Sequence, residues 1–218
     1  MTLDKLYGVF DSRCKSYSSR IQHIISTRAT IEEWKFNYQT EVLISDMWQS
    51  WCLFCRSLFF ESCRGTKARN NASIAPRPYD NSWKRLGYEA KQYSSGSGCR
   101  PTGHINFLIR KEPTWGDLNV FLKILTNIQI KPANQPHLIT TFGSFTDLKH
   151  LQRVRNACAH KNVETMQDIK QLTSSYSFSR LSCAPQLAWS TKSPGQEYAI
   201  EHWLFEMNLI ADLATSTS

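Results

Sequence analysis

The sequence predicts a mostly α-helical protein, and three observations support this prediction. Apolar residues recur at three- and four-residue spacings over several long segments, which is the helical period. No segment shows the sustained alternation of a half-buried strand. Hydrophobic residues make up 41% of the 218 positions, enough to build one substantial core. We therefore expect a single domain over residues 1–218, without internal repeats.

Two long helices are predicted in the first third of the chain. The first covers about residues 3 to 26, and the second about residues 30 to 63, with Gly65 as its stop. The second helix is rich in aromatic residues and is expected to be largely buried. It contains Cys52 and Cys55 at a zinc-ligand spacing, but no second such pair follows anywhere in the chain. We interpret both as core cysteines.

An irregular basic insertion is predicted at about residues 64–113, where the helical period fails and Pro, Gly and Ser accumulate. Its basic residues are interleaved with Tyr79, Trp83, Tyr88 and Tyr93, a combination that suits single-stranded RNA. A solvated, charged insertion without a ligand would have the same composition. The residues expected to bind RNA are Lys84, Arg85, Lys91, Arg100, Arg110 and Lys111.

The second half of the chain predicts four further helical segments. One runs from Thr114, as its N-cap, to a stop at Pro132, and the next begins near Ser144 or Thr146. Helical spacing returns over residues 163–172, becomes irregular over 176–195, and ends in a strong stretch over 197–213. Residues 105–109 and 138–142 are candidates for short strands inside loops.

Charge and cysteine content restrict the partners and the compartment. A formal net charge of +8 favours a polyanionic partner, although charge alone does not separate RNA from DNA or an anionic membrane. The seven cysteines are an odd number and are scattered, which favours a reducing cytoplasm over a disulfide framework. Neither a secretory signal nor an apolar run of membrane-spanning length is present. We expect a cytoplasmic protein without membrane contact.

Residues 155–162 read Arg-Asn-Ala-Cys-Ala-His-Lys-Asn and follow directly on the fourth helical pattern. Arg155 is a permanent cation whose guanidinium can donate two hydrogen bonds to phosphate oxygens, and histidine, the residue type of His160, changes charge near neutral pH. On a straight helix His160 would point roughly 140° away from Arg155. The two side chains meet at one phosphate only if the helix ends or bends near Ala159, or if two copies of the chain bring their motifs together.

The spelling Arg-Asn-x-x-x-His resembles the hallmark of HEPN domains, a helical family in which many members with this motif are ribonucleases. The resemblance implies an antiparallel helical bundle that pairs into a homodimer, with both motifs lining a shared cleft. It also implies a toxin or antiviral-defence effector that attacks tRNA or mRNA and is controlled by an antitoxin or an activating partner protein. The family often adds an acidic residue, for which Asp46 and Glu41 are candidates, and Lys161 adds a cation.

These observations lead to the hypothesis of a metal-independent endoribonuclease without cofactors, in which Arg155, Asn156 and His160 are catalytic. His160 would move the proton of the 2′-hydroxyl or of the leaving 5′-oxygen, while Arg155 stabilises the charge on the phosphate. Asn156 would orient His160 or a phosphate oxygen. Two alternatives stay open: a non-catalytic HEPN-like module that binds RNA or a partner protein, and a helical scaffold in which the motif has no function.

Overall fold

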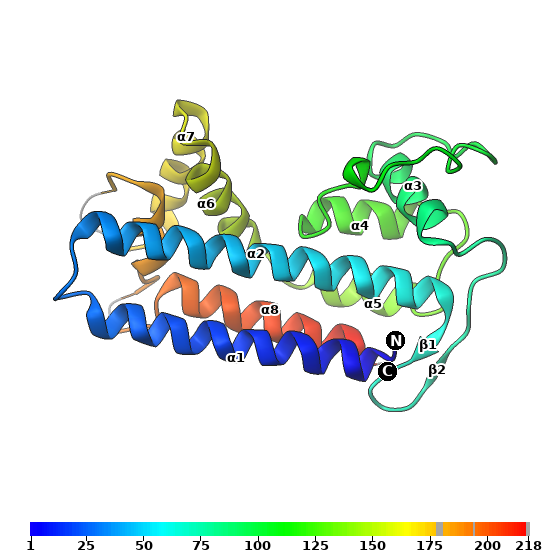
Figure 1. The fold of residues 1–218 in the computed structure, drawn as a ribbon, viewed down its shortest axis with the longest axis horizontal. Helices are drawn as coiled ribbons and strands as arrows, with labels where there is room; N and C mark the ends of the chain where they lie inside the picture. Colours follow the sequence, from blue (N-terminus) through cyan, green and yellow to red (C-terminus); the bar gives the residue numbers. More distant parts are fainter. Residues whose placement is uncertain (178–180, 194, 217–218) are drawn as a thin grey trace. The chain divides into compact units, whose positions relative to one another are not determined.

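The computed structural model describes residues 1–177, 181–193 and 195–216. Most of these residues are helical, so the mostly α class predicted from the sequence is confirmed (Figure 1). Strands β1 (Thr66–Lys67) and β2 (Ser73–Ile74) form a small antiparallel pair, with Thr66 opposite Ile74. Among the described helices, none combines the length and the hydropathy that a membrane crossing requires.

The chain divides into two compact units. Unit 1 comprises Met1–Phe10, Trp51–Phe145 and the end of the chain from Leu209. Unit 2 comprises Asp11–Ser50 and Thr146–Asn208. Three helices contribute residues to both units: α1 (Leu3–Thr27), α2 (Glu33–Arg64) and α8 (Ala199–Thr215).

The first two helices and the last one confirm the sequence prediction closely. Helix α2 ends at Arg64, and the following Gly65 has a φ of 83°, in the left-handed region that glycine adopts without a Cβ penalty. A Cβ at this position would lie 2.7 Å from atoms of Pro76, so the turn also requires the missing side chain. Gly65 therefore acts as the helix stop that the sequence indicated.

Unit 1 adds α3 (Trp83–Ser94), the 3-10 turn η1 (Ile109–Lys111), α4 (Leu118–Asn127) and α5 (Gln135–Gly143). Helix α4 contacts both α3 and α5 (Figure 1). The core is aromatic: the ring of Phe142 lies 4.5 Å from Phe121 and 5.9 Å from Trp51. The indole of Trp51 is fully buried and donates to the carbonyl of Gly116 at 3.1 Å.

Four local predictions in unit 1 are wrong. The insertion contains helix α3, residues 138–142 lie in helix α5, and residues 105–109 form turns and the start of η1 instead of a strand. Helix α3 begins where the Ser82 hydroxyl accepts the Arg85 amide at 3.3 Å, and it buries Leu86, Ala90 and Tyr93. Its apolar period was hidden by Gly87 and by the surrounding Pro and Gly residues. Helix α4 is capped by Asp117 and not by Thr114.

Unit 2 contains α6 (Leu148–His160), α7 (Val163–Gln171), the turns η2 (Leu172–Ser175) and η3 (Ala184–Trp189), and the first half of α8. Helix α6 packs against α7 and η3. Segments of α1 and α2 lie side by side in this unit, where the Tyr17 hydroxyl is 2.6 Å from that of Ser50. The core of unit 2 includes Leu151 on α6 and Trp203 on α8, both fully buried.

Candidate functional site

The Arg-Asn-x-x-x-His motif occupies the last two turns of α6. Buried residues at helical spacing, Leu148, Leu151 and Val154, fix the face that α6 turns toward the core. The helix stays regular through His160, and Lys161 then adopts a left-handed conformation with a φ of 47°. Helix α6 ends one residue after Ala159, but Arg155 and His160 both keep helical positions, so one chain directs their side chains toward different sides of the helix.

Arg155 is half-buried and lines a cavity of about 200 Å³ against α2. Its Nη1 donates to the Oδ1 of Asn156 at 3.3 Å, so the two motif residues are already in contact. Tyr38 lines the same cavity and is 61% exposed. The guanidinium could bind an anion and the exposed ring could stack on a flat base within this one cavity. The other lining residues are Glu41, Val42, Ser45, Cys158 and Ala159.

Lys161 and Glu41 form an ion pair, with Nζ and Oε2 2.9 Å apart. The hydrogen bond and the charge of Glu41 raise the pKa of Lys161. Because Glu41 also lines the Arg155 cavity, the structure brings Glu41, Arg155 and Lys161 into one neighbourhood. His160 is exposed at the end of α6 and does not line this cavity.

Asp46, the other acidic candidate, has a different partner. Its Oδ2 lies 2.7 Å from Nη1 of Arg20 on α1, and its carbonyl accepts the Tyr17 hydroxyl at 3.1 Å. Five helical positions separate Asp46 from Glu41, which places the two carboxylates about 140° apart around α2. Of the two, only Glu41 lines the cavity of the motif.

Cys158 lies within the motif and is 9% exposed. Burial and the negative charge of Glu41 raise the pKa of its thiol to about 12. Since the thiolate is the nucleophilic form of cysteine, this side chain is chemically quiet at neutral pH. The cavity therefore offers charged and hydrogen-bonding side chains, and no thiolate nucleophile, to a ligand.

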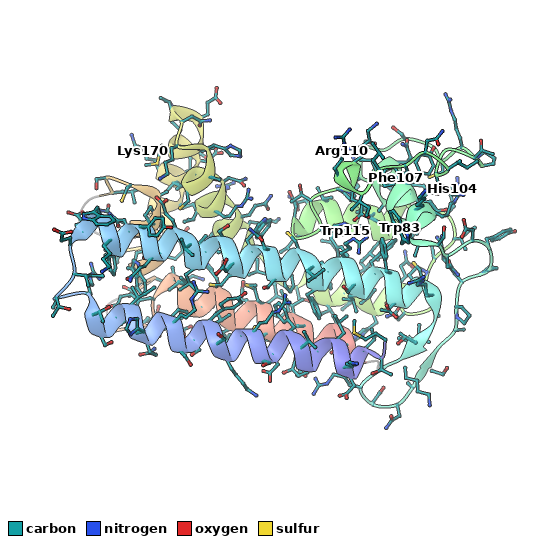
Figure 2. All side chains as sticks on the ribbon, viewed as in Figure 1. Trp83, His104, Phe107, Arg110, Trp115 and Lys170 are labelled. Carbon is teal, nitrogen blue, oxygen red and sulfur yellow. The ribbon has the colours of Figure 1, made fainter. Side chains whose placement is uncertain are left out.

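The basic residues predicted to bind RNA lie in unit 1, whereas the motif lies in unit 2. Arg85 is half-buried and donates to Glu89 at 2.5 Å and to the Pro101 carbonyl at 2.8 Å, so its guanidinium holds the insertion together. Of the four aromatics, Tyr88 and Tyr93 are buried, while Tyr79 and Trp83 are exposed. The other five residues predicted to bind RNA are exposed: Lys84, Lys91, Arg100, Arg110 and Lys111. Figure 2 labels Arg110 among them.

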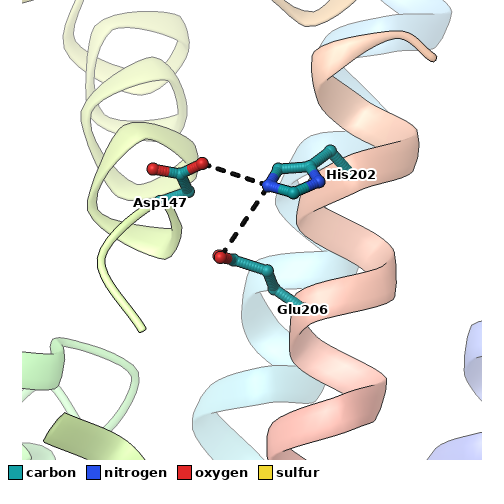
Figure 3. Close-up of side chains that lie close together, drawn as sticks. All are labelled: Asp147, His202 and Glu206. Carbon is teal, nitrogen blue, oxygen red and sulfur yellow. Dashed lines mark hydrogen bonds and ion pairs between the residues drawn. The ribbon is translucent and has the colours of Figure 1, made fainter. Parts of the chain in front are cut away.

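A second polar cluster, which sequence reasoning missed, lies at the other end of α6. Nε2 of His202 is 3.0 Å from Oδ2 of Asp147 and 3.8 Å from Oε1 of Glu206 (Figure 3). His202 and Glu206 stand four residues apart on α8, and Asp147 is the residue before α6. The pair His202-x-x-x-Glu206 was the available signal, but nothing local linked it to Asp147.

Comparison with known proteins gives no relative for this chain: it matches no family model, no curated protein and no solved structure. The resemblance to HEPN domains therefore rests on the motif residues.

Proposed function

We propose that the chain is a metal-independent endoribonuclease of the HEPN type, with Arg155, Asn156 and His160 as its catalytic residues. The observation that supports this most directly is the placement of Arg155 in a cavity that also presents an exposed aromatic ring, Tyr38. In this reading the guanidinium binds the scissile phosphate and the ring stacks on a neighbouring base. The side-chain Oδ1 of Asn156, which accepts from Nη1 of Arg155, holds the guanidinium in position.

The proposed active site requires two copies of the chain. Helix α6 is regular through His160, so Arg155 and His160 of one chain point to different sides. A two-fold pairing of two α6 ends would place His160 of one copy opposite Arg155 of the other, and such C2 contacts are the commonest oligomeric arrangement. Val163, which is 73% exposed and follows the motif in the sequence, is an apolar side chain that such a pairing would cover.

The reaction follows from the residues that this arrangement brings together. His160 accepts the proton of a ribose 2′-hydroxyl, whose oxygen attacks the adjacent phosphorus while the bond to the 5′-oxygen breaks. Arg155 stabilises the negative charge that grows on the phosphate oxygens. The leaving 5′-oxygen takes up a proton from water, so the products are a 2′,3′-cyclic phosphate and a 5′-hydroxyl. DNA resists cleavage because it lacks the attacking hydroxyl.

The first test is cleavage of total tRNA and of a mixed-sequence RNA in excess EDTA, with the new ends mapped chemically. We expect cyclic-phosphate ends from the wild type and their loss in Arg155→Ala and His160→Ala. Arg153→Ala and His23→Ala are matched controls, since both are exposed residues of the same types in unit 2. RNA that is bound but left intact by the wild type would favour the alternative, a non-catalytic RNA-binding module.

A mixing experiment tests the composite site. Arg155→Ala and His160→Ala chains, each inactive alone, are co-expressed so that mixed dimers form. One of the two sites in a mixed dimer then contains an intact Arg155 and an intact His160, so roughly a quarter of wild-type activity should return at equal expression. No recovery, with mixed dimers demonstrated, would show that both residues must come from the same chain.

A further inference from the structure

The cluster of Asp147, His202 and Glu206 has an incomplete set of partners. Glu206 is 8% exposed, and its Oε2 is buried without a hydrogen-bond partner among the residues that the structure describes. The Glu206 carboxyl accepts one hydrogen bond from the backbone N–H of Leu148, which leaves Oε2 as the oxygen without a partner. A buried carboxylate oxygen that lacks a donor costs free energy, and a bound cation would offset this cost. The side chain faces the imidazole of His202, as Figure 3 shows.

Asp147 also departs from its usual role. It occupies the N-cap position of α6, where an aspartate commonly accepts an amide of the first turn, yet its side chain makes no such capping bond. Its Oδ2 contacts His202 and the ammonium group of Lys192 instead. The carboxylate therefore points away from the start of α6 and toward α8, where His202 and Glu206 lie.

We propose that Asp147, His202 and Glu206 form a binding site for a divalent transition-metal ion of the zinc class. The ligands are Nε2 of His202 and one oxygen of each carboxylate. These atoms lie within 4.8 Å of one another. Ligands about 2.1 Å from a tetrahedral zinc ion are about 3.4 Å apart, and the observed separations of 3.0 and 3.8 Å bracket that value.

The surroundings of His202 support the assignment. Its other ring nitrogen, Nδ1, lies 3.1 Å from Oε1 of Glu197. Metal-binding histidines usually donate this second N–H to a carboxylate, which fixes the tautomer and aims the opposite nitrogen at the ion. Here that opposite nitrogen is Nε2, the atom that faces Asp147 and Glu206. Glu197 is thus a positioning residue for His202.

Charge and access also fit a divalent ion. Two carboxylates and a neutral imidazole carry two negative charges, which one divalent cation balances, whereas Lys192 supplies a single positive charge to Asp147. A cavity of about 410 Å³ reaches His202 and is also lined by Lys192, Glu197 and Tyr176, although Asp147 and Glu206 do not line it. With three protein ligands, the fourth position of a tetrahedral ion stays open to water.

The test is a calorimetric titration of the full chain, stripped with EDTA and dialysed, with Zn²⁺. We expect uptake of one equivalent, lost by more than about 100-fold in His202→Gln and Glu206→Gln and weakened by about 10- to 100-fold in Glu197→Gln. Lys192→Met should tighten binding, because it removes the cation that competes for Asp147. Glu164→Gln and His23→Gln, exposed residues of the same types in unit 2, serve as matched controls.

The absorption spectrum of the Co²⁺ form identifies the ligands. Nitrogen and oxygen ligation gives weak visible bands, which should disappear in His202→Gln. A strong thiolate-to-cobalt band in the near ultraviolet would assign the ion to cysteines and overturn the proposal. Zinc uptake that is absent, or that survives both ligand variants in folded protein, would also overturn it. RNA cleavage in EDTA is independent of this site, so the nuclease and the metal site stand or fall separately.

Discussion

The two units bury charged side chains in opposite ways. In unit 1, Arg77 has a side chain only 1% exposed, but it pairs with Glu89 at 2.7 Å and donates to Asn81 at 2.6 Å and to the Ile130 carbonyl at 3.2 Å. In unit 2, the buried Oε2 of Glu206 has no such partner among the described residues. Oε2 of Glu89 also lacks a hydrogen bond of good geometry, but the Arg77 guanidinium lies 2.7 Å from it, whereas Nε2 of His202 lies 3.8 Å from Glu206. A buried carboxylate that its own chain pairs closely with a cation is a structural element, whereas one without a close cation is a candidate place for a ligand.

The largest expected effect comes from breaking the satisfied cluster. Arg77→Met leaves the carboxylate of Glu89 buried with one cation fewer and should lower the free energy of unfolding by about 3–5 kcal/mol. Urea-induced unfolding followed by circular dichroism measures this loss. Lys84→Met, an exposed lysine of the same unit, is the control and should change stability by about 0.5 kcal/mol or less. A loss below about 1 kcal/mol for Arg77→Met would contradict the comparison.

A smaller effect is expected from a neutral network in unit 2. The buried Tyr176 hydroxyl lies 2.8 Å from Nδ1 of His150 and accepts Nε1 of Trp203 at 3.2 Å. Tyr176→Phe leaves both partners without this oxygen and should lower the free energy of unfolding by about 1–3 kcal/mol. Thermal unfolding of the two proteins measures the difference. Equal stability of the two proteins would mean that water replaces the hydroxyl. The network would then depend on solvent, whereas the cluster around Arg77 is satisfied by its own chain.

The incomplete cluster predicts the opposite sign. Burial and the charge of Asp147 raise the pKa of Glu206, so the folded protein holds this proton more tightly than the unfolded chain, and ionisation at neutral pH opposes folding. Glu206→Gln should therefore raise the free energy of unfolding of the metal-free protein by about 1 kcal/mol at pH 7. The gain should shrink as the pH falls through the raised pKa and vanish below 4.5, the ordinary value, where the wild-type carboxyl becomes protonated in both states.

The charges of three neighbours, Asp147, His202 and Lys192, also shift the pKa of the Glu206 carboxyl. His202 and Lys192 lower the pKa of Glu206 and so limit the effect of burial. Adding Zn²⁺ should reverse the order of stability, because the ion stabilises only the protein that can ligate it. Unfolding scans with EDTA and with Zn²⁺ measure both signs. A Gln variant that is less stable in EDTA would show that Glu206 already has a favourable partner.

The sequence predicts the parts of this molecule that rest on local spacing. Helices α1, α2 and α8 were found because their apolar residues repeat without interruption, and α6 was found together with its motif. Helix α3 escapes prediction because Gly87 breaks its apolar period, and the short apolar stretch of residues 138–142, which lies in α5, is also compatible with a strand. Their helical state depends on capping by Ser82 and on Pro136 in the first turn.

The two candidate sites also differ in how far they depend on local sequence. The motif on α6 is contiguous, so its residues were identified before their surroundings were known. The contact of Asp147 with His202 joins positions 55 residues apart and depends on how α6 packs in unit 2. Neither residue is unusual in its own sequence context. Spacing reveals such a cluster only in part, through the four-residue step from His202 to Glu206 on one face of α8.

The smallest stability effect is expected at the exposed pair of unit 2. The Lys161 side chain is 64% exposed, so Lys161→Met should change the free energy of unfolding by no more than about 1 kcal/mol. The same variant should affect RNA cleavage, because Glu41 lines the cavity of Arg155 and would lose the cation that now pairs with it. An unpaired carboxylate there competes with phosphate for the guanidinium and should raise the KM for RNA cleavage. The double variant Lys161→Met with Glu41→Gln removes the competitor and should restore the KM; a double variant as weak as the single one would mean that Lys161 contacts the RNA itself.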